Sequence, residues 1–116
     1  MKDLVSVIIP NRNGADTIGK CLAAAQVSQH GNFEIIVVDD ASADNSIEVI
    51  RNYACKLVRL EQHGGAAKAR NAGASHSRGW MLFFTDADCL LQPDTLTLAA
   101  AALALEGSNA IIGGTY

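Results

Sequence analysis

Short apolar runs alternate with longer stretches of helical spacing along the 116-residue chain. Five of these runs are rich in β-branched and aromatic residues, a composition that predicts β-strands. The predicted strands are Leu4–Ile9, Phe33–Val38, Lys56–Leu60, Trp80–Thr85 and Ala110–Gly113. Because strands that alternate with helices form parallel sheets covered on both faces, the pattern predicts an α/β fold with a mainly parallel, Rossmann-like sheet.

Four helices are predicted between and after these strands from apolar or small residues that recur at helical spacing. Asp16 is the expected N-cap of the first helix, and Asp44 or Ser46 that of the second. The predicted helical segments are a stripe from Ile18 to Ala25, a stripe from Ile47 to Ala54, the small residues of Ala66–Ser77, and a segment from Pro93 to Glu106.

Composition limits the class of protein. Hydrophobic residues make up 49% of the chain and charged residues 18%, which favours a globular protein, and the length fits one domain at most. No apolar run reaches the roughly 18 residues of a membrane-spanning helix. Pro10 interrupts the N-terminal apolar stretch, which favours a strand over a signal peptide. We therefore expect a cytoplasmic protein, with the inner face of a membrane as the alternative if sequence outside this chain anchors it.

Charge and cysteine content exclude further classes. The net charge of −3 gives no general electrostatic reason to bind nucleic acid. The three cysteines are odd in number and widely spaced, which fits neither a disulfide framework nor a zinc site. We expect them to be reduced, with Cys21 and Cys55 as small core residues and Cys89 beside two acids.

Polar clusters follow three of the predicted strands. These are "PNRNGAD" after the first strand, "DDASAD" at the end of the second and "DADC" after the fourth. In open parallel sheets, ligands bind outside the carboxyl ends of the strands, near the point where the strand order reverses. The three clusters are therefore expected to converge on one crevice.

Asp86 and Asp88 lie one residue apart after the fourth predicted strand. In an extended segment the two carboxylates would face the same way and could hold Mg²⁺ or Mn²⁺, which take oxygen ligands. The alternative is that one of the acids caps the following turn.

Asp39 and Asp40 end the second predicted strand, where an acid can accept hydrogen bonds from a ribose or a base. Ligand binding is favoured more for Asp40 than for Asp39. The alternative is capping of the next helix, although Ser42 and Asp44 already offer caps there.

The segment "HGGAAKARNAG" joins a Gly-Gly turn to a helix that carries Lys68 and Arg70. A helix N-terminus and cations can together bind a phosphate. The alternative for Lys68 and Arg70 is a solvated helix face. The alternative for His63 is a turn residue without a role. The chain has neither a Walker A loop nor the glycine fingerprint of dinucleotide-binding proteins. ATPase and dehydrogenase functions are therefore disfavoured.

Four ordered segments resemble the N-terminal half of family-2 glycosyltransferases, which are inverting nucleotide-sugar enzymes with a GT-A fold. The segments are "VSVIIPNRNGADTIGKCL", "FEIIVVDDASADNS", "HGGAAKARNAG" and "FFTDADCLLQPDTL". The resemblance covers nearly all of the chain. It implies that residues 1–116 are the nucleotide-sugar-binding part of a GT-A domain that continues beyond them.

The resemblance also implies residue roles on the nucleoside side. Pro10 and Arg12 would belong to the nucleoside pocket, Asp40 would be the partner of the base, and Arg70 would lie near the nucleotide. Arg12 stands where the family often has an aromatic residue, and His63 where asparagine is common. The nucleotide is thus left open, with UDP favoured.

Asp86 and Asp88 match the family's Asp-x-Asp motif. The resemblance implies that Asp86 lies near the ribose and metal and that Asp88 binds the metal, Mn²⁺ or Mg²⁺, that neutralises the leaving diphosphate. The acceptor, a glycan, a lipid or another molecule, stays open.

We identify no general base in this chain, since Asp94 and Glu106 lie at predicted helix ends. A noncatalytic nucleotide-sugar-binding module is therefore the alternative to a glycosyltransferase. A nucleotidyltransferase is a weaker alternative, because such an enzyme should carry a Gly-rich basic loop after its first strand and "PNRNGAD" is not one. We expect the isolated chain to be inactive in transfer and to self-associate or be poorly stable through exposed apolar surface.

Overall fold

Four parallel strands form the sheet in the computed structural model, which describes residues 4–106. They are β1 (Val5–Asn11), β2 (Phe33–Asp40), β3 (Lys56–Leu60) and β4 (Met81–Phe84), in the spatial order β3-β2-β1-β4. Each begins within one residue of its predicted start. The predicted mainly parallel α/β fold is confirmed, while the predicted strand Ala110–Gly113 lies outside the described residues.

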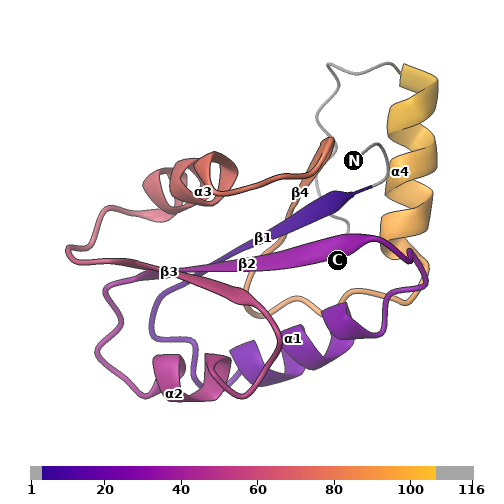
Figure 1. The fold of residues 1–116 in the computed structure, drawn as a ribbon. Coiled ribbons are helices and arrows are strands. Elements are labelled where there is room, and N and C mark those ends of the chain that lie inside the picture. The colour runs from indigo at the N-terminus through magenta and orange to yellow at the C-terminus, as the bar shows by residue number, and fades with distance from the viewer. Residues whose placement is uncertain (1–3, 107–116) are drawn as a thin grey trace.

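Helices cover both faces of this sheet. They are α1 (Ile18–Gln26), α2 (Ser46–Ile50), α3 (Ala66–Ser75) and α4 (Thr95–Glu106). Figure 1 shows α1 and α2 on one side of the sheet and α3 on the other. Apolar side chains of α1, α2 and α4 share one core with β1, β2 and β4, whereas α3 packs through Ala69 on Ile36 and Val38 of the opposite face.

The close approach of α3 to the sheet depends on its small residues, as predicted. A Cβ added at Gly73 would lie 2.4 Å from Ile8 Cγ2 and 3.2 Å from Val38 Cγ2. No side chain larger than hydrogen fits there without a shift of the sheet or the helix. Because α3 follows β3, this contact fixes the N-terminus of α3 at the carboxyl edge of the sheet.

Two details of the predicted helices are wrong. Asp16 is not the N-cap of α1, since that position is held by Thr17, which makes no side-chain capping hydrogen bond. The second helix ends at Ile50 and does not reach Ala54. Beyond it, Asn52 N and Tyr53 N donate to the carbonyl oxygens three residues earlier, which tightens the chain into turns.

The apolar segment after Pro93 forms α4 from Thr95, two residues later than predicted, and the helix ends at Glu106 as predicted. Leu96 and Leu103 are buried against the sheet, while Leu98 and Leu105 are exposed. Within residues 4–106, no helix combines the length and the apolar character that crossing a membrane requires.

Candidate functional site

The carboxyl ends of β1, β2 and β4 meet at one edge of the sheet. In the strand order β3-β2-β1-β4, β1 is connected to β2 on one side but pairs with β4 on the other, so the order reverses beside β1. A pocket of about 210 Å³ opens at this edge. Its lining residues come from the ends of three strands, from α3 and from the loop before it: Pro10, Asn11, Arg12, Asp40, His63, Ala66, Ala69 and Asp86. The predicted convergence of the polar clusters is therefore observed.

Size alone would have chosen a different pocket. A hollow of about 600 Å³ lies beside the ends of β2 and β3, lined by residues that include Asp39 and Arg59, and one of about 580 Å³ lies at the opposite edge, at the starts of the same strands. Neither hollow is lined by Pro10, Arg12, Asp40, Arg70, Asp86 or Asp88. Because ligands of open parallel sheets bind at the carboxyl ends where the strand order reverses, which here is beside β1, we assign the site to the smaller pocket.

Asp39 ties the loop after β2 to the end of β1. Its buried carboxylate accepts hydrogen bonds from Asn11 Nδ2 at 3.0 Å, from Ser42 N at 3.0 Å and from Ser42 Oγ at 2.7 Å. Ser42 Oγ in turn accepts from Asn13 N at 2.9 Å, and Asn13 Oδ1 accepts from Ala43 N at 2.7 Å. Asp39 thus fixes the loop after β2 against the end of β1.

Asp40 holds the loop that precedes α3. Its Oδ1 accepts from Gly64 N at 2.7 Å, and its Oδ2 accepts from Gly65 N at 2.9 Å and lies 2.7 Å from His63 Nδ1. Gly65 has a φ of 90°, which glycine adopts without strain. Burial alone would raise the pKa of Asp40, but the hydrogen bonds from Gly64, Gly65 and His63 lower it below its ordinary value. The carboxylate is therefore ionised at neutral pH.

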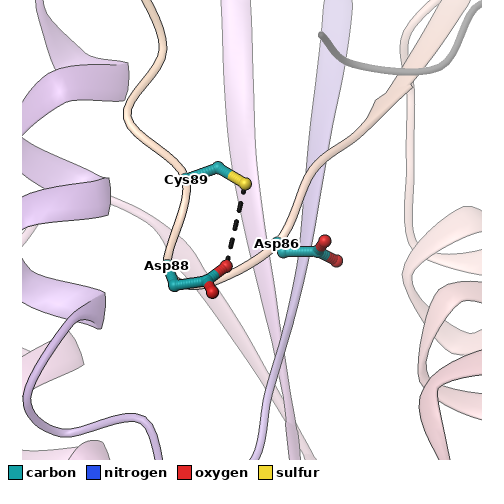
Figure 2. Close-up of side chains that lie close together, drawn as sticks. All are labelled: Asp86, Asp88 and Cys89. Carbon is teal, nitrogen blue, oxygen red and sulfur yellow. Dashed lines mark hydrogen bonds between the residues drawn. The ribbon is translucent and has the colours of Figure 1, made fainter. Parts of the chain in front are cut away.

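Asp86 and Asp88 lie on a turn and not in an extended segment. Cys89 N donates to Asp86 O at 3.1 Å, which closes the turn, so the predicted reason for two carboxylates on one face is wrong. Their proximity is nevertheless observed, because one carboxylate oxygen of each acid and Cys89 Sγ lie within 4.8 Å of one another. Figure 2 shows the thiol of Cys89 directed at Asp88, with Sγ 3.7 Å from Oδ1.

Cys21 of α1 supports this turn from the core. Its buried Sγ donates to Asp86 O at 3.5 Å. Burial, together with Cys89, Asp88 and Asp86 nearby, raises the pKa of Cys21 to about 12. The predicted assignment of Cys21 to the core is confirmed, and Cys55 is half-buried against the same core.

The donor set of the turn fits a hard divalent cation. Both carboxylates are exposed, and oxygen ligands are those that Mg²⁺ and Mn²⁺ prefer. Arg70 Nη2 lies 4.0 Å from Asp86 Oδ1, with about half of each side chain exposed. Arg70 thus lies beside Asp86, although Arg70, Lys68 and Asp88 are not among the described residues that line the pocket.

Asn11 and His63 line the pocket although neither was among the predicted site residues. Asn11 belongs to the polar cluster after β1, and its position directly after Pro10 was the available signal. Among residues 4–106, the buried Asn11 Oδ1 and Thr85 Oγ1 make no hydrogen bond. Both belong to the strand ends that flank the site, β1 and β4.

The fold is that of an α/β domain of the GT-A type. The family model of glycosyl transferase family 2 matches residues 6–116. The chain belongs to glycosyltransferase family 2.

Relatives agree with this assignment. The chain is 35% identical over 117 residues to the glycosyltransferase AglE of Haloferax volcanii, which covers 90% of this chain and 38% of AglE. Residues 1-349 of S. aureus TarS, solved with UDP-GlcNAc, are 31% identical with a TM-score of 0.79, over 87% of this chain and 30% of that one. The mannosyltransferase PcManGT from Pyrobaculum calidifontis, solved with GDP-Man and Mn²⁺, is 32% identical with a TM-score of 0.79, over 83% of this chain and 31% of that one.

The matched region is only part of these proteins. The chain spans 40% of the glycosyltransferase GlyG of Streptococcus pneumoniae, to which it is 28% identical, and 38% of AglE. More than half of each of these relatives lies outside the match.

Proposed function

We propose that this chain binds a nucleoside diphosphate sugar, with UDP as the nucleotide, for an inverting, metal-dependent glycosyl transfer. The observation that carries this proposal is the pocket at the sheet edge, where Pro10, Arg12, Asp40 and Asp86 come together from three strands. The similarity to TarS and PcManGT, which were solved with nucleotide sugars, supports it.

Each residue has a role in this proposal that follows from its place. Pro10 and Arg12 at the end of β1 form one side of the nucleoside pocket, with Arg12 offering a cation to the base or ribose. Asp40 forms the base-binding side, together with the loop that it holds. Arg70, beside Asp86, faces the nucleotide at the N-terminal half of α3.

Asp86 and Asp88 are the residues that would hold the divalent cation, Mn²⁺ or Mg²⁺. When bound there, such a cation supplies positive charge that stabilises a departing nucleoside diphosphate. Asp86 would contact both this group and the ribose, since it also lines the pocket. Arg70 adds a fixed positive charge at the same place.

Calorimetry tests the proposal. UDP is titrated into the 116-residue chain with and without Mn²⁺, and then into Asp88→Ala and Asp94→Ala. We expect Mn²⁺ to strengthen UDP binding, and Asp88→Ala to abolish that gain. Asp94→Ala is the matched control, because Asp94 is a nearby exposed acid outside the Asp86–Cys89 cluster. Unchanged UDP and Mn²⁺ binding in Asp88→Ala would contradict the proposal.

We further propose that the acceptor site and the general base belong to parts of the protein outside residues 1–116, as more than half of GlyG and AglE lies outside the match. General-base help is worth roughly 10²–10⁴-fold in rate, so the isolated chain should bind donor without useful transfer. Incubation with radiolabelled nucleotide sugars, Mn²⁺ and a panel of acceptors measures this. Robust transfer would favour a complete active site over a donor-binding module.

Self-association of the isolated chain belongs to the same proposal. Leu98 and Leu105 of α4 are 62% and 89% exposed, which leaves apolar surface for contact between copies. Light scattering on the purified chain would show a mass above that of a monomer, and a monomeric mass at all concentrations would contradict it.

A further inference from the structure

We propose that His63, oriented by Asp40, determines nucleotide specificity. Its Nε2 accepts a hydrogen bond from an N–H of the base, which favours uracil over cytosine. The inference rests on the proposed function, because it assumes that the pocket takes a nucleoside. It assigns a role to a residue that stood outside the predicted site.

The proton on His63 can be placed from its partner. Both oxygens of Asp40 accept a backbone N–H, from Gly64 and Gly65 respectively, so the carboxyl group acts as an ionised acceptor. A carboxylate 2.7 Å from His63 Nδ1 requires a proton on that nitrogen. In the neutral imidazole, Nδ1–H leaves Nε2 with a lone pair, so Nε2 is an acceptor.

His63 and Asp40 differ in how much acceptor capacity they offer to a ligand. The Asp40 side chain is 5% exposed, and its Oδ2 already meets two donors, Gly65 N and His63 Nδ1. The His63 side chain is 54% exposed and lines the pocket. Among the described residues, the only partner of its ring is Asp40, through Nδ1. Asn11 Oδ1, which also has no hydrogen bond among these residues, is buried, so Nε2 of the half-exposed His63 is the acceptor that we assign to the base, and Asp40 acts by orienting it.

The chemistry of the base edge follows from this placement. Uracil carries an N–H at ring position 3 and a carbonyl at position 4, whereas cytosine has a bare acceptor nitrogen at position 3 and an amino group at position 4; the contact proposed for Nε2 is with position 3. An acceptor on the protein pairs with the first and is left unpaired against the second, and a site built to hydrogen-bond one group discriminates against the analogue that lacks it. UDP and CDP carry the same ribose and diphosphate, so their affinity ratio reports the base contact alone.

The first experiment measures this ratio. UDP and CDP are titrated into the 116-residue chain with Mn²⁺, above the titration range of an ordinary histidine, for wild type, His63→Phe and Arg70→Ala. We expect wild type to prefer UDP by about tenfold, the value of one hydrogen bond, and His63→Phe to bind both alike. Arg70→Ala is the matched control, because a lost contact on the shared part of the ligand weakens both nucleotides and leaves their ratio unchanged.

The outcomes separate this inference from the function on which it rests. Binding of UDP with a UDP-to-CDP ratio that His63→Phe does not change overturns the role of His63 and leaves the proposed function intact. Failure of wild type to bind any nucleoside diphosphate overturns both.

A second experiment needs no substitution. Long-range proton–nitrogen NMR correlations of the wild-type chain distinguish the two neutral tautomers of His63. The Nδ1–H form is expected, and addition of UDP should shift the Nε2 resonance while Nδ1 keeps its proton. A His63 ring that carries its proton on Nε2 would overturn the inference, since that atom would then be a donor.

Discussion

Two pairs of aspartates end neighbouring segments of the same sheet edge, and they have opposite surroundings. Asp39 and Asp40, at the end of β2, are buried and accept hydrogen bonds from two loops. Asp86 and Asp88, after β4, are exposed on a turn. The ion pair of Asp86 with Arg70 and the thiol contact of Asp88 are both long, at 4.0 and 3.7 Å.

The difference separates acids that build a site from acids that are free to bind a ligand. A carboxylate whose oxygens are occupied by backbone N–H groups fixes loop geometry but has little capacity left for a ligand. An exposed carboxylate contributes little to folding, yet it can give all its lone pairs to a cation. The same residue type, at equivalent strand ends, therefore holds loops in place in one pair and is available for the proposed cation in the other.

The largest effect on stability is expected from Asp39→Ala. Removal of this buried acceptor leaves the Ser42 amide without a partner and leaves Asn11 Nδ2 only its 3.4 Å contact with Ser42 Oγ, and an unsatisfied buried donor costs about 1–3 kcal/mol. We expect a loss of about 3 kcal/mol in the free energy of unfolding, measured by urea denaturation. Asp88→Ala should stay within about 0.5 kcal/mol of wild type. Equal losses of stability in Asp39→Ala and Asp88→Ala would contradict the difference between the two pairs of aspartates.

Removal of the metal should affect binding and leave folding unchanged. With a chelator present, UDP affinity should fall about tenfold or more, since a charge-assisted contact is worth about 1.5–3 kcal/mol. Uridine, which lacks the diphosphate, should bind equally well with and without metal. A parallel loss of uridine binding would show that Asp86 and Asp88 also shape the nucleoside side.

Acid should weaken the contribution of Asp40 to stability. Because the pKa of Asp40 is lower in the folded chain than in the unfolded one, its contribution to stability is present above about pH 4 and is lost as pH falls through the folded value. Asp44 has a lowered pKa as well, chiefly from its hydrogen bond with Ser46. The comparison of unfolding free energies between wild type and Asp40→Asn isolates Asp40, and their difference should shrink in acid. A difference independent of pH would contradict the role of its charge.

The smallest effect is expected from Arg70→Ala on stability. Its ion pair with Asp86 is long and half-exposed, and such surface pairs contribute about 0–1 kcal/mol. The unfolding midpoint in urea should barely change, whereas UDP affinity should fall because a cation beside the nucleotide is lost. A large loss of stability would show that the exposed turn is structural after all.

Much of the fold follows from local sequence signals. The strands β1 and β2 could be predicted because both of their faces are buried, which leaves short, nearly continuous apolar runs, whereas the edge strand β3 exposes Lys56 and Arg59 and was found from the apolar residues between and after them. The early end of the second helix could not, since the same apolar residues suit a helix or a turn, and Tyr53 packs on the core from the turn. The cap of α1 was missed because Asp16 has the right side chain but the helix begins one residue too late.

The location of the site could be predicted from the sequence, whereas its detailed geometry could not. Parallel strands bring their carboxyl ends to one edge, so Asp40 and Asp86 had to approach the same crevice. The turn at Asp86–Cys89 and the loop held by Asp40 depend on backbone contacts between distant segments. His63 illustrates the limit, because its partner is 23 residues away in the chain and no local pattern connects the two.

The strand order also has a consequence for how the chain folds. The central strand β1 pairs with β4, so Val5 lies beside Met81, and one wall of the pocket forms only when nearly the whole described chain has closed on itself. Such distant pairings slow folding, because the entropy of a long loop must be lost before any contact compensates for it. Trp80, the single tryptophan, donates its backbone N–H to Leu4 O at the start of this pairing. Its fluorescence in a refolding experiment should therefore report when β4 pairs with β1 and the pocket that we propose for the nucleotide is completed.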